Sequence, residues 1–353
     1  MVERIYECSV TTTSNTLKKA QLINEGQIFI PPSLSSSLVF NKSHAGPNSF
    51  IPCLTFQWND HRVKLEITKD PEAVFSLQQE RNAYTILKEQ TEFLREITIL
   101  PNPFHAPGQI FLTLEDRCIY HCAFCDLSTE GILHHHYSTE DFLHLIEKAI
   151  KDHNIKNVAL TSGIYPTNKK IIEEMCFIIT HIKNNYPTIS FGVEPSIFSV
   201  EEIQALKQAG ADEIKINIQI PDKRLFERIC PDFSYPAVLQ ALQDAVALFG
   251  KGNVTSNIIY GLGETDASVI EMMNHLSSIG VVPTLRKIRL NNINKKELEQ
   301  RLQHQIKPIS SERIVQLARQ QKTILQKYDL TPQTFQTMCH ACGCCDLVPF
   351  CDI

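Results

Sequence analysis

The chain has 353 residues, of which 43% are hydrophobic and 21% charged, and its formal net charge is −5. This composition is ordinary for a globular protein, and it lacks the basic excess that a nucleic-acid-binding surface normally needs. No apolar run approaches the roughly 20 residues that span a bilayer, and the N-terminal residues have no apolar signal core. We therefore expect a cytoplasmic protein without nucleic-acid or membrane partners, built as one large domain or as one large and one small domain.

Residues 1–105 contain turn-rich stretches between short apolar runs. Segment 62–68 (RVKLEIT) alternates apolar and charged residues, which predicts a half-buried strand, and segment 96–100 (EITIL) predicts another. A helix is expected over 71–90. We predict that 1–105 form a small, mostly β domain of the α+β class, which ends at the proline-rich turn 101–108.

From residue 109 the sequence alternates regularly between strand and helix patterns. Ser138 and Asp141 have capping-box spacing at the start of the first helix. Gly210, Gly250 and Gly280 mark helix ends. The expected strands are 109–114, 158–161, 189–194, 213–219, 254–261 and 282–290, and the expected helices lie near 139–152, 168–185, 199–209, 235–249, 266–279 and 310–328.

Six strand–helix units in series imply a parallel sheet with right-handed crossovers. Six units rather than eight predict an α/β fold over 106–330, namely a partial, open-sided (β/α)6 TIM-like barrel. Ligands of such a barrel bind at the carboxyl ends of the strands.

The 12 cysteines are unevenly distributed. Three lie in residues 118–125 and five in residues 339–351, while Cys8, Cys53, Cys176 and Cys230 are scattered and are expected to be core residues. A disulfide framework fits a small secreted chain, which this is not. Two tight clusters therefore predict two metal sites.

The first cluster lies directly after the first strand of the barrel, in the sequence LEDRCIYHCAFCDL. A zinc ribbon normally needs two closely spaced cysteine pairs or added histidines, whereas Cys118, Cys122 and Cys125 suit an iron–sulfur cluster with one iron left open. The C-x3-C-x2-C spacing, with Phe124 before the third cysteine, resembles the radical S-adenosylmethionine superfamily. The resemblance implies a [4Fe–4S] cluster that cleaves S-adenosylmethionine.

Further segments resemble cofactor-binding parts of that superfamily. In TSGIYPT (161–167), Ser162 and Gly163 stand where the glycine-rich segment that meets the methionine amine is expected, although paired glycines and an acid are missing. An ordinary turn at the end of a strand is the alternative. Glu194 ends the third strand and is placed to meet a cationic part of the cofactor, unless it is a solvated loop residue.

The fourth and fifth strands carry two more such segments. INIQ resembles the ribose-binding pattern of the biotin and lipoyl synthases, and Asn217 and Gln219 share one strand face because they are two residues apart. NIIYGLGET (257–265) resembles the adenine-supporting segment through Ile259, Gly261 and Glu264, with Asn257 in place of a glycine. In the sixth strand, Arg286 or Arg289 is expected to bind a carboxylate of cofactor or substrate; a salt bridge to the helix layer is the alternative.

The tail, 331–353, shows no helix periodicity and supplies Cys339, Cys342, Cys344, Cys345 and Cys351. Four of these five are expected to hold a second [4Fe–4S] cluster, with Gly343 allowing a tight turn. A structural zinc site is the alternative. The tail is expected to close the open barrel from its carboxyl end or from its side.

The resemblance implies that a 5′-deoxyadenosyl radical takes hydrogen from an unactivated carbon. The similarity to the biotin synthase/lipoyl synthase-like branch, together with the second cluster, favours sulfur insertion. A subunit of the two-protein archaeal type of lipoyl synthase, acting on an octanoyl group on a carrier protein, is one form of this expectation. Expected partners are an electron donor such as ferredoxin or flavodoxin, and a carrier protein or partner subunit. The alternatives are radical C-methylation, a carbon-skeleton rearrangement, and a non-catalytic iron–sulfur carrier or maturation scaffold.

Overall fold

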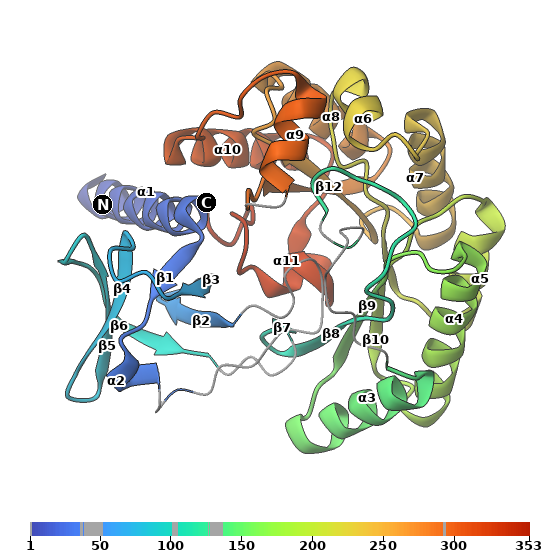
Figure 1. The fold of residues 1–353 in the computed structure, drawn as a ribbon, viewed down its shortest axis with the longest axis horizontal. Helices are drawn as coiled ribbons and strands as arrows, with labels where there is room; N and C mark the ends of the chain where they lie inside the picture. The colour runs from blue at the N-terminus through green and yellow to red at the C-terminus, as the bar shows by residue number, and fades with distance from the viewer. Residues whose placement is uncertain are drawn as a thin grey trace.

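The computed structural model describes residues 2–35, 38, 52–100, 105–125, 127, 137–291 and 294–353. Its strands form two separate sheets, one from each half of the predicted organisation. Figure 1 shows the smaller sheet at the left and the larger sheet at the right, with the C-terminal segment running between them. Residues 101–104 of the expected junction lie outside the described residues.

The smaller sheet is a closed barrel with the strand order β1-β3-β2-β6-β5-β4. Leu54, Phe56, Val63 and Leu65 point into its core and are at most 1% exposed, because alternate residues of a strand face opposite sides. Its strands are β1 (Gln27–Phe29), β2 (Cys53–Trp58), β3 (His61–Thr68), β4 (Phe75–Glu80), β5 (Ala83–Lys88) and β6 (Thr91–Ile99), and a short helix α2 (Pro32–Ser35) follows β1.

The helix expected over 71–90 is wrong, because these residues form a hairpin. β4 and β5 pair in antiparallel fashion from Phe75↔Lys88 to Glu80↔Ala83. The tight connection between them places Arg81 at φ 55°. Phe75 and Leu77, two residues apart, are both buried in the barrel core, and this strand periodicity outweighs a weak helix propensity.

The larger sheet has seven strands in the order β13-β12-β11-β10-β9-β8-β7. All pairs are parallel except β7–β8, and β8 and β13 are not neighbours in this order, so the sheet is open between them. The predicted partial (β/α)6 barrel is therefore confirmed. Its strands are β7 (His105–Ala106), β8 (Gln109–Thr113), β9 (Asn157–Thr161), β10 (Ser190–Glu194), β11 (Glu213–Lys215), β12 (Val254–Tyr260) and β13 (Val281–Lys287).

Helices cover the outside of this sheet, as Figure 1 shows. Their ends follow the sequence signals: Ser138 and Asp141 form the capping box, and Gly210 and Gly250 are C-caps. The helices are α3 (Thr139–His153), α4 (Asn168–Asn185), α5 (Val200–Ala209), α6 (Lys223–Ile229), α7 (Tyr235–Phe249), α8 (Asp266–Ser278), α9 (Asn294–Leu302) and α10 (Ser311–Lys327).

Several helices were not expected, among them α2, α6 and α9, and two further ones join distant parts of the chain. The first is α1 (Val2–Glu25), which packs against both α10 and β3 and so bridges the two sheets. Its sequence VTTTSNT has low helix propensity, so its packing partners explain the helix better than its composition does. The second is α11 (Met338–Cys342) in the cysteine-rich tail, which Figure 1 shows at the centre of the molecule.

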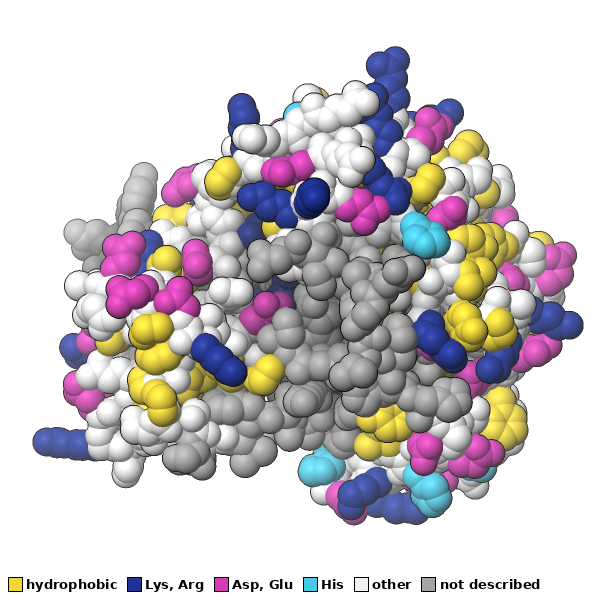
Figure 2. Space-filling model, in the orientation of Figure 1, with side chains coloured by type: hydrophobic (Ala, Val, Ile, Leu, Met, Phe, Trp, Pro, Cys, Tyr) yellow, Lys and Arg dark blue, Asp and Glu magenta, His cyan; other side chains and the backbone are white. Residues whose placement is uncertain are grey.

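The described surface is mixed in charge. Figure 2 shows basic and acidic side chains interspersed over one face of the molecule. Within the ranges given above, no helix combines the length and apolarity needed to cross a bilayer.

Candidate functional site

A cavity of about 390 Å³ lies inside the open barrel and reaches the small barrel. Most of the predicted site residues line it, and three do not: Gly261, Glu264 and Cys351. The predicted residues that line it are Cys118, Cys122, Phe124, Cys125, Ser162, Gly163, Glu194, Asn217, Gln219, Ile259, Arg286, Cys339, Cys342, Cys344 and Cys345.

The first cysteine loop follows β8 and is held by its backbone. Ile119 N donates to Ile164 O and Ala123 N donates to Ile229 O, each at 2.9 Å. His121 N donates to the Asp232 carboxylate at 2.7 Å. These bonds attach the loop to neighbouring loops of the barrel, so the three thiols are carried on a fixed segment rather than on a free turn.

Cys122 has a sulfur neighbour that the sequence did not indicate. Its thiol is hydrogen-bonded with Cys230, and this bond together with burial raises the pKa of Cys122 well above its ordinary value. Cys230 was expected to be a core residue; it is only 1% exposed and also lines the cavity.

Ser162 and Gly163 support the segment before the cysteines. Ser162 Oγ accepts from Glu115 N at 3.2 Å, and Gly163 N donates to Glu115 O at 2.7 Å. A Cβ on Gly163 would lie 2.2 Å from the Arg117 carbonyl oxygen, so only glycine permits this approach. The geometry therefore gives both residues a role in positioning the loop.

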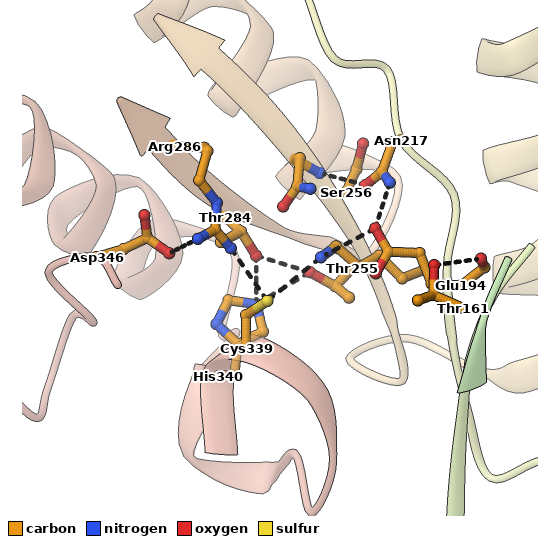
Figure 3. A network of polar contacts seen from close by, with 12 residues as sticks. Thr161, Glu194, Asn217, Thr255, Ser256, Thr284, Arg286, Cys339, His340 and Asp346 are labelled. Atoms are coloured by element: carbon orange, nitrogen blue, oxygen red, sulfur yellow. Dashed lines mark hydrogen bonds and ion pairs between the residues drawn. The ribbon is translucent and has the colours of Figure 1, made fainter. Parts of the chain in front are cut away.

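A chain of polar contacts crosses the strands beside the cavity (Figure 3). Asn217 Nδ2 donates to Glu194 Oε1 at 2.6 Å, and Asn217 Oδ1 accepts from Asn257 N at 3.0 Å. Lys215 Nζ lies 3.2 Å from the same Glu194 oxygen. Burial opposes the charge of Lys215, but Cys339 and Glu194 outweigh it and raise the pKa of the ammonium. Glu194 is therefore an ion-pair partner inside the barrel and not a solvated loop residue.

Asn257 leaves one acceptor unused. Its Oδ1 is buried and has no hydrogen-bond partner, and the residue lines the cavity. A buried amide oxygen without a partner is costly, which favours a hydrogen-bond donor bound beside it. Adenine and ribose both carry such donors, so this position fits the adenosyl part of S-adenosylmethionine.

Gln219 has a left-handed backbone, with φ 58°. It continues the pairing with β12 through Gln219 N to Asn257 O, and it forms an isolated parallel bridge with Ile258. A non-glycine residue in this region costs energy and is typical of functional sites.

Glu264 lies outside the cavity and fastens the loop after β12. Its two carboxylate oxygens accept from Gly261 N and Leu262 N, each at 2.7 Å, and one also pairs with Arg313 at 2.8 Å. A Cβ on Gly261 would overlap Ile309, at 2.1 Å. The expectation of direct cofactor contact by Gly261 and Glu264 is therefore not supported by this geometry, which gives them a structural role.

The start of the tail meets the amino ends of the strands, which corrects the expectation that it closes the barrel from its carboxyl end. Gln109, the first residue of β8, exchanges hydrogen bonds with Met338 N and O at 2.7 and 2.9 Å. Glu213, the first residue of β11, accepts from Gln336 N at 2.6 Å and from Thr337 N at 3.1 Å. The first cysteine loop lies at the opposite, carboxyl ends, so the two groups of cysteines face the cavity from opposite ends.

His340 anchors α11 in the barrel. Its Nε2 lies 3.0 Å from Thr255 Oγ1 and 3.1 Å from Thr284 Oγ1 (Figure 3). Burial, with the positive charge of Lys215, lowers the pKa of His340 to about 3. The ring is therefore neutral and serves as a hydrogen-bond partner in the interior.

Cys339 faces two cations at the floor of the cavity. Arg286 Nη2 lies 3.0 Å and Lys215 Nζ 3.4 Å from its sulfur. Arg286 Nη1 also pairs with Asp346 at 3.2 Å. Arg286 is thus the arginine directed into the barrel, whereas Arg289 pairs with Glu66 of the small barrel at 3.3 Å.

A buried ionic network attaches the end of the tail to α1 and the small barrel. Lys19 Nζ contacts Asp352 Oδ2 and Gly343 O, each at 2.7 Å. His61 Nδ1 lies 2.9 Å from Asp352 Oδ1. The side chains of Lys19 and Asp352 are 1% and 3% exposed, so the N-terminal region fixes the tail through contacts that water does not reach.

The thiols next to this network do not converge on a point. Among the described residues, no group of three or more histidine, cysteine, aspartate or glutamate side chains is arranged to hold a single metal ion. Thiolates around one zinc ion all lie about 2.3 Å from it, whereas those of a [4Fe–4S] cluster bind different irons. Each group consists of cysteine thiols that line the cavity, a donor set that suits an iron–sulfur cluster.

Some cavity residues were missed by the sequence analysis. Lys215 was detectable, because in the strand expected over 213–219 it lies two residues before Asn217; the structure ends β11 at Lys215, and both residues line the cavity. Lys64, His105 and Asp346 also line the cavity, but they come from segments whose approach to the barrel has no local sequence signal. Cys53 also lines the cavity, so the expectation that it is a core residue is wrong.

Comparisons with known proteins agree with this geometry. Residues 113–276 match the family model described as the radical SAM superfamily. A lipoyl synthase from Caldicellulosiruptor saccharolyticus is 25% identical over 226 residues, which are 62% of this chain and 75% of that protein. A probable GTP 3′,8-cyclase from Thermococcus kodakarensis is 22% identical over 171 residues, which are 48% of this chain and 53% of that protein.

The fold is also similar to a solved structure, that of the FeFe-hydrogenase maturase HydG from Carboxydothermus hydrogenoformans. The TM-score is 0.52 at 17% identity, over 62% of this chain and 52% of that chain. The chain thus spans three quarters of the lipoyl synthase and about half of the cyclase and of the maturase. The family match thus identifies residues 113–276 as a radical SAM domain, and the fold and the placement of the three cysteines after β8 agree with it.

Proposed function

We propose that this protein is a radical S-adenosylmethionine enzyme that inserts sulfur into an unactivated C–H bond. Cys118, Cys122 and Cys125 hold the cluster that cleaves S-adenosylmethionine, and tail cysteines hold a second [4Fe–4S] cluster that supplies the sulfur. The observation that carries the proposal is that both groups of cysteines line one cavity from opposite ends. A substrate bound in that cavity would lie between the two groups.

The residues between the two ends bind and orient the adenosyl group. Asn257 offers an unpaired amide oxygen, and the Asn217 and Glu194 pair beside it supplies further polar atoms for ribose hydroxyls. Ile259 is 6% exposed and lines the same wall. Its apolar surface supports the adenine and helps to exclude water from the reacting atoms.

When bound, the first cluster and S-adenosylmethionine would supply a 5′-deoxyadenosyl radical that takes one hydrogen atom from a C–H bond of the substrate. The second cluster would supply a sulfide that bonds to the resulting carbon radical, while one of its irons accepts the remaining electron. Each cleavage consumes one electron, for which we propose a donor of the ferredoxin or flavodoxin class. Lys215 and Arg286 stabilise negative charge on Cys339 at the floor of the cavity.

The similarity to a lipoyl synthase supports sulfur insertion over other radical reactions. We favour an acyl chain on a carrier protein as the substrate class. Two sulfur insertions into one chain would require two molecules of S-adenosylmethionine, because each cleavage removes one hydrogen atom.

The test is turnover of anaerobically reconstituted protein whose clusters carry labelled sulfide. The protein is incubated with dithionite, S-adenosylmethionine and an octanoylated carrier-protein peptide. We expect 5′-deoxyadenosine, and labelled sulfur in the peptide at the expense of cluster sulfide. Formation of 5′-deoxyadenosine with an altered peptide that contains no sulfur would contradict sulfur insertion, and absence of both clusters would contradict the whole proposal.

A further inference from the structure

The small barrel presents one polar face of its β2–β3 ribbon to the tail. The register pairs Cys53 with Glu66 and Thr55 with Lys64. Because facing residues of an antiparallel pair share a side, these four side chains lie on the face opposite the apolar core. Cys53, Lys64 and Glu66 all line the cavity, so this face borders the site.

The tail is bonded directly to β3, the strand that carries Lys64 and Glu66. Lys64 N donates to Cys344 O at 3.2 Å, which joins β3 to the middle of the cysteine sequence. The Lys19–Asp352 pair and the bond from Lys19 to Gly343 O hold both sides of the same segment. The position of the tail thiols relative to Cys53 is therefore set by main-chain and buried ionic contacts.

The second cluster needs four cysteine ligands, and the tail alone supplies three suitable ones. Cys351 is exposed and does not line the cavity. Cys339 contacts Arg286 and Lys215 at the floor of the barrel, at 3.0 and 3.4 Å. Cys342, Cys344 and Cys345 remain, and a [4Fe–4S] cluster normally takes four thiolates.

We propose that Cys53 is the fourth ligand of the second cluster, together with Cys342, Cys344 and Cys345. The inference rests on the proposed second cluster and adds a role for the small barrel. That barrel would then be a ligand-donating part of the site, and Cys339 would remain as a separate thiol that faces the barrel interior.

The experiment isolates the second cluster by replacing Cys118, Cys122 and Cys125 with alanine in the full chain. This parent variant is reconstituted anaerobically, and its iron, zinc and acid-labile sulfide are measured together with the electron paramagnetic resonance spectrum after reduction. We expect about four irons per chain. Adding Cys53→Ala should lower the iron content at least fourfold, and adding Cys351→Ala or Cys339→Ala should leave it unchanged.

Cys53→Ser is a second variant of similar size, in which an oxygen ligand should shift the spectrum even if iron is retained. Circular dichroism of the metal-free variants checks that each one folds. Four irons with an unchanged spectrum in both Cys53 variants would overturn the role of Cys53 and leave the second cluster intact. A parent variant that binds zinc, or no metal, would instead overturn the second cluster itself.

Discussion

The two groups of cysteines differ in how the chain holds them. Cys118, Cys122 and Cys125 lie on one loop within the residues that match the radical SAM family, and neighbouring barrel loops fasten that loop. The tail cysteines lie outside the matched residues and depend on distant parts of the chain, namely the first residues of β8 and β11, α1 and the small barrel.

The difference suggests a division of labour. Under the proposed function, the loop after β8 would generate the radical, and the tail with the small barrel would determine what the radical reaction produces. A change in the first group should therefore abolish radical formation, whereas a change in the second should alter its outcome. The following predictions test this comparison.

The largest effect is expected when Cys118, Cys122 and Cys125 are all replaced by alanine. Without these thiolates the open iron that binds S-adenosylmethionine is lost, so 5′-deoxyadenosine formation should fall to background. The matched control is a variant with Cys342, Cys344 and Cys345 replaced, which should still release 5′-deoxyadenosine. Equal loss in both variants would mean that the two groups do not have separate roles.

Next in size is the effect of Lys19→Met on stability. This change leaves Asp352 as a buried carboxylate with one cation removed, and breaking such a pair costs about 3–5 kcal/mol. Denaturant titration should show this loss in the free energy of unfolding. Lys148→Met breaks an exposed pair with Asp152 and should leave the free energy of unfolding nearly unchanged. A similarly small change for Lys19→Met would show that the tail is not held as described.

Asn217→Ala should weaken binding of S-adenosylmethionine by about 10- to 100-fold. It removes the bonds to Glu194 and to Asn257 N and leaves their buried partners unsatisfied, a penalty of about 1–3 kcal/mol. Calorimetric titration of the reconstituted protein measures the change. Asn274→Ala on α8, whose side chain bonds to Ile270 O, should leave the affinity unaltered.

The smallest effect is expected for Cys351→Ala. Because this residue is exposed and outside the cavity, iron content should not change and the free energy of unfolding should vary by no more than about 0.5 kcal/mol. Loss of about four irons would show that Cys351 is a ligand of the second cluster and would contradict its exclusion from the ligand set.

The partial barrel and its first cysteine loop were predictable from local signals. Strand–helix alternation, the cap at Ser138 and the cysteine spacing each depend only on residues that are close together in the sequence. The placement of the tail was not predictable, because it depends on Gln109 and Glu213 meeting residues 336–338 more than 100 positions away. The roles of Cys53 and Lys64 were hidden for the same reason, since the chain gives no local sign that the small barrel borders the cavity.

The central claim is that one cavity holds a radical-generating cluster at one end and a second cluster at the other. Its most direct test is the electron paramagnetic resonance spectrum of reduced, reconstituted protein with and without S-adenosylmethionine, combined with iron analysis. We predict about eight irons per chain, with one signal that changes on addition of S-adenosylmethionine and one that does not. Replacing Cys118, Cys122 and Cys125 should remove only the responsive signal. About four irons and a single signal in the unaltered protein would contradict the account.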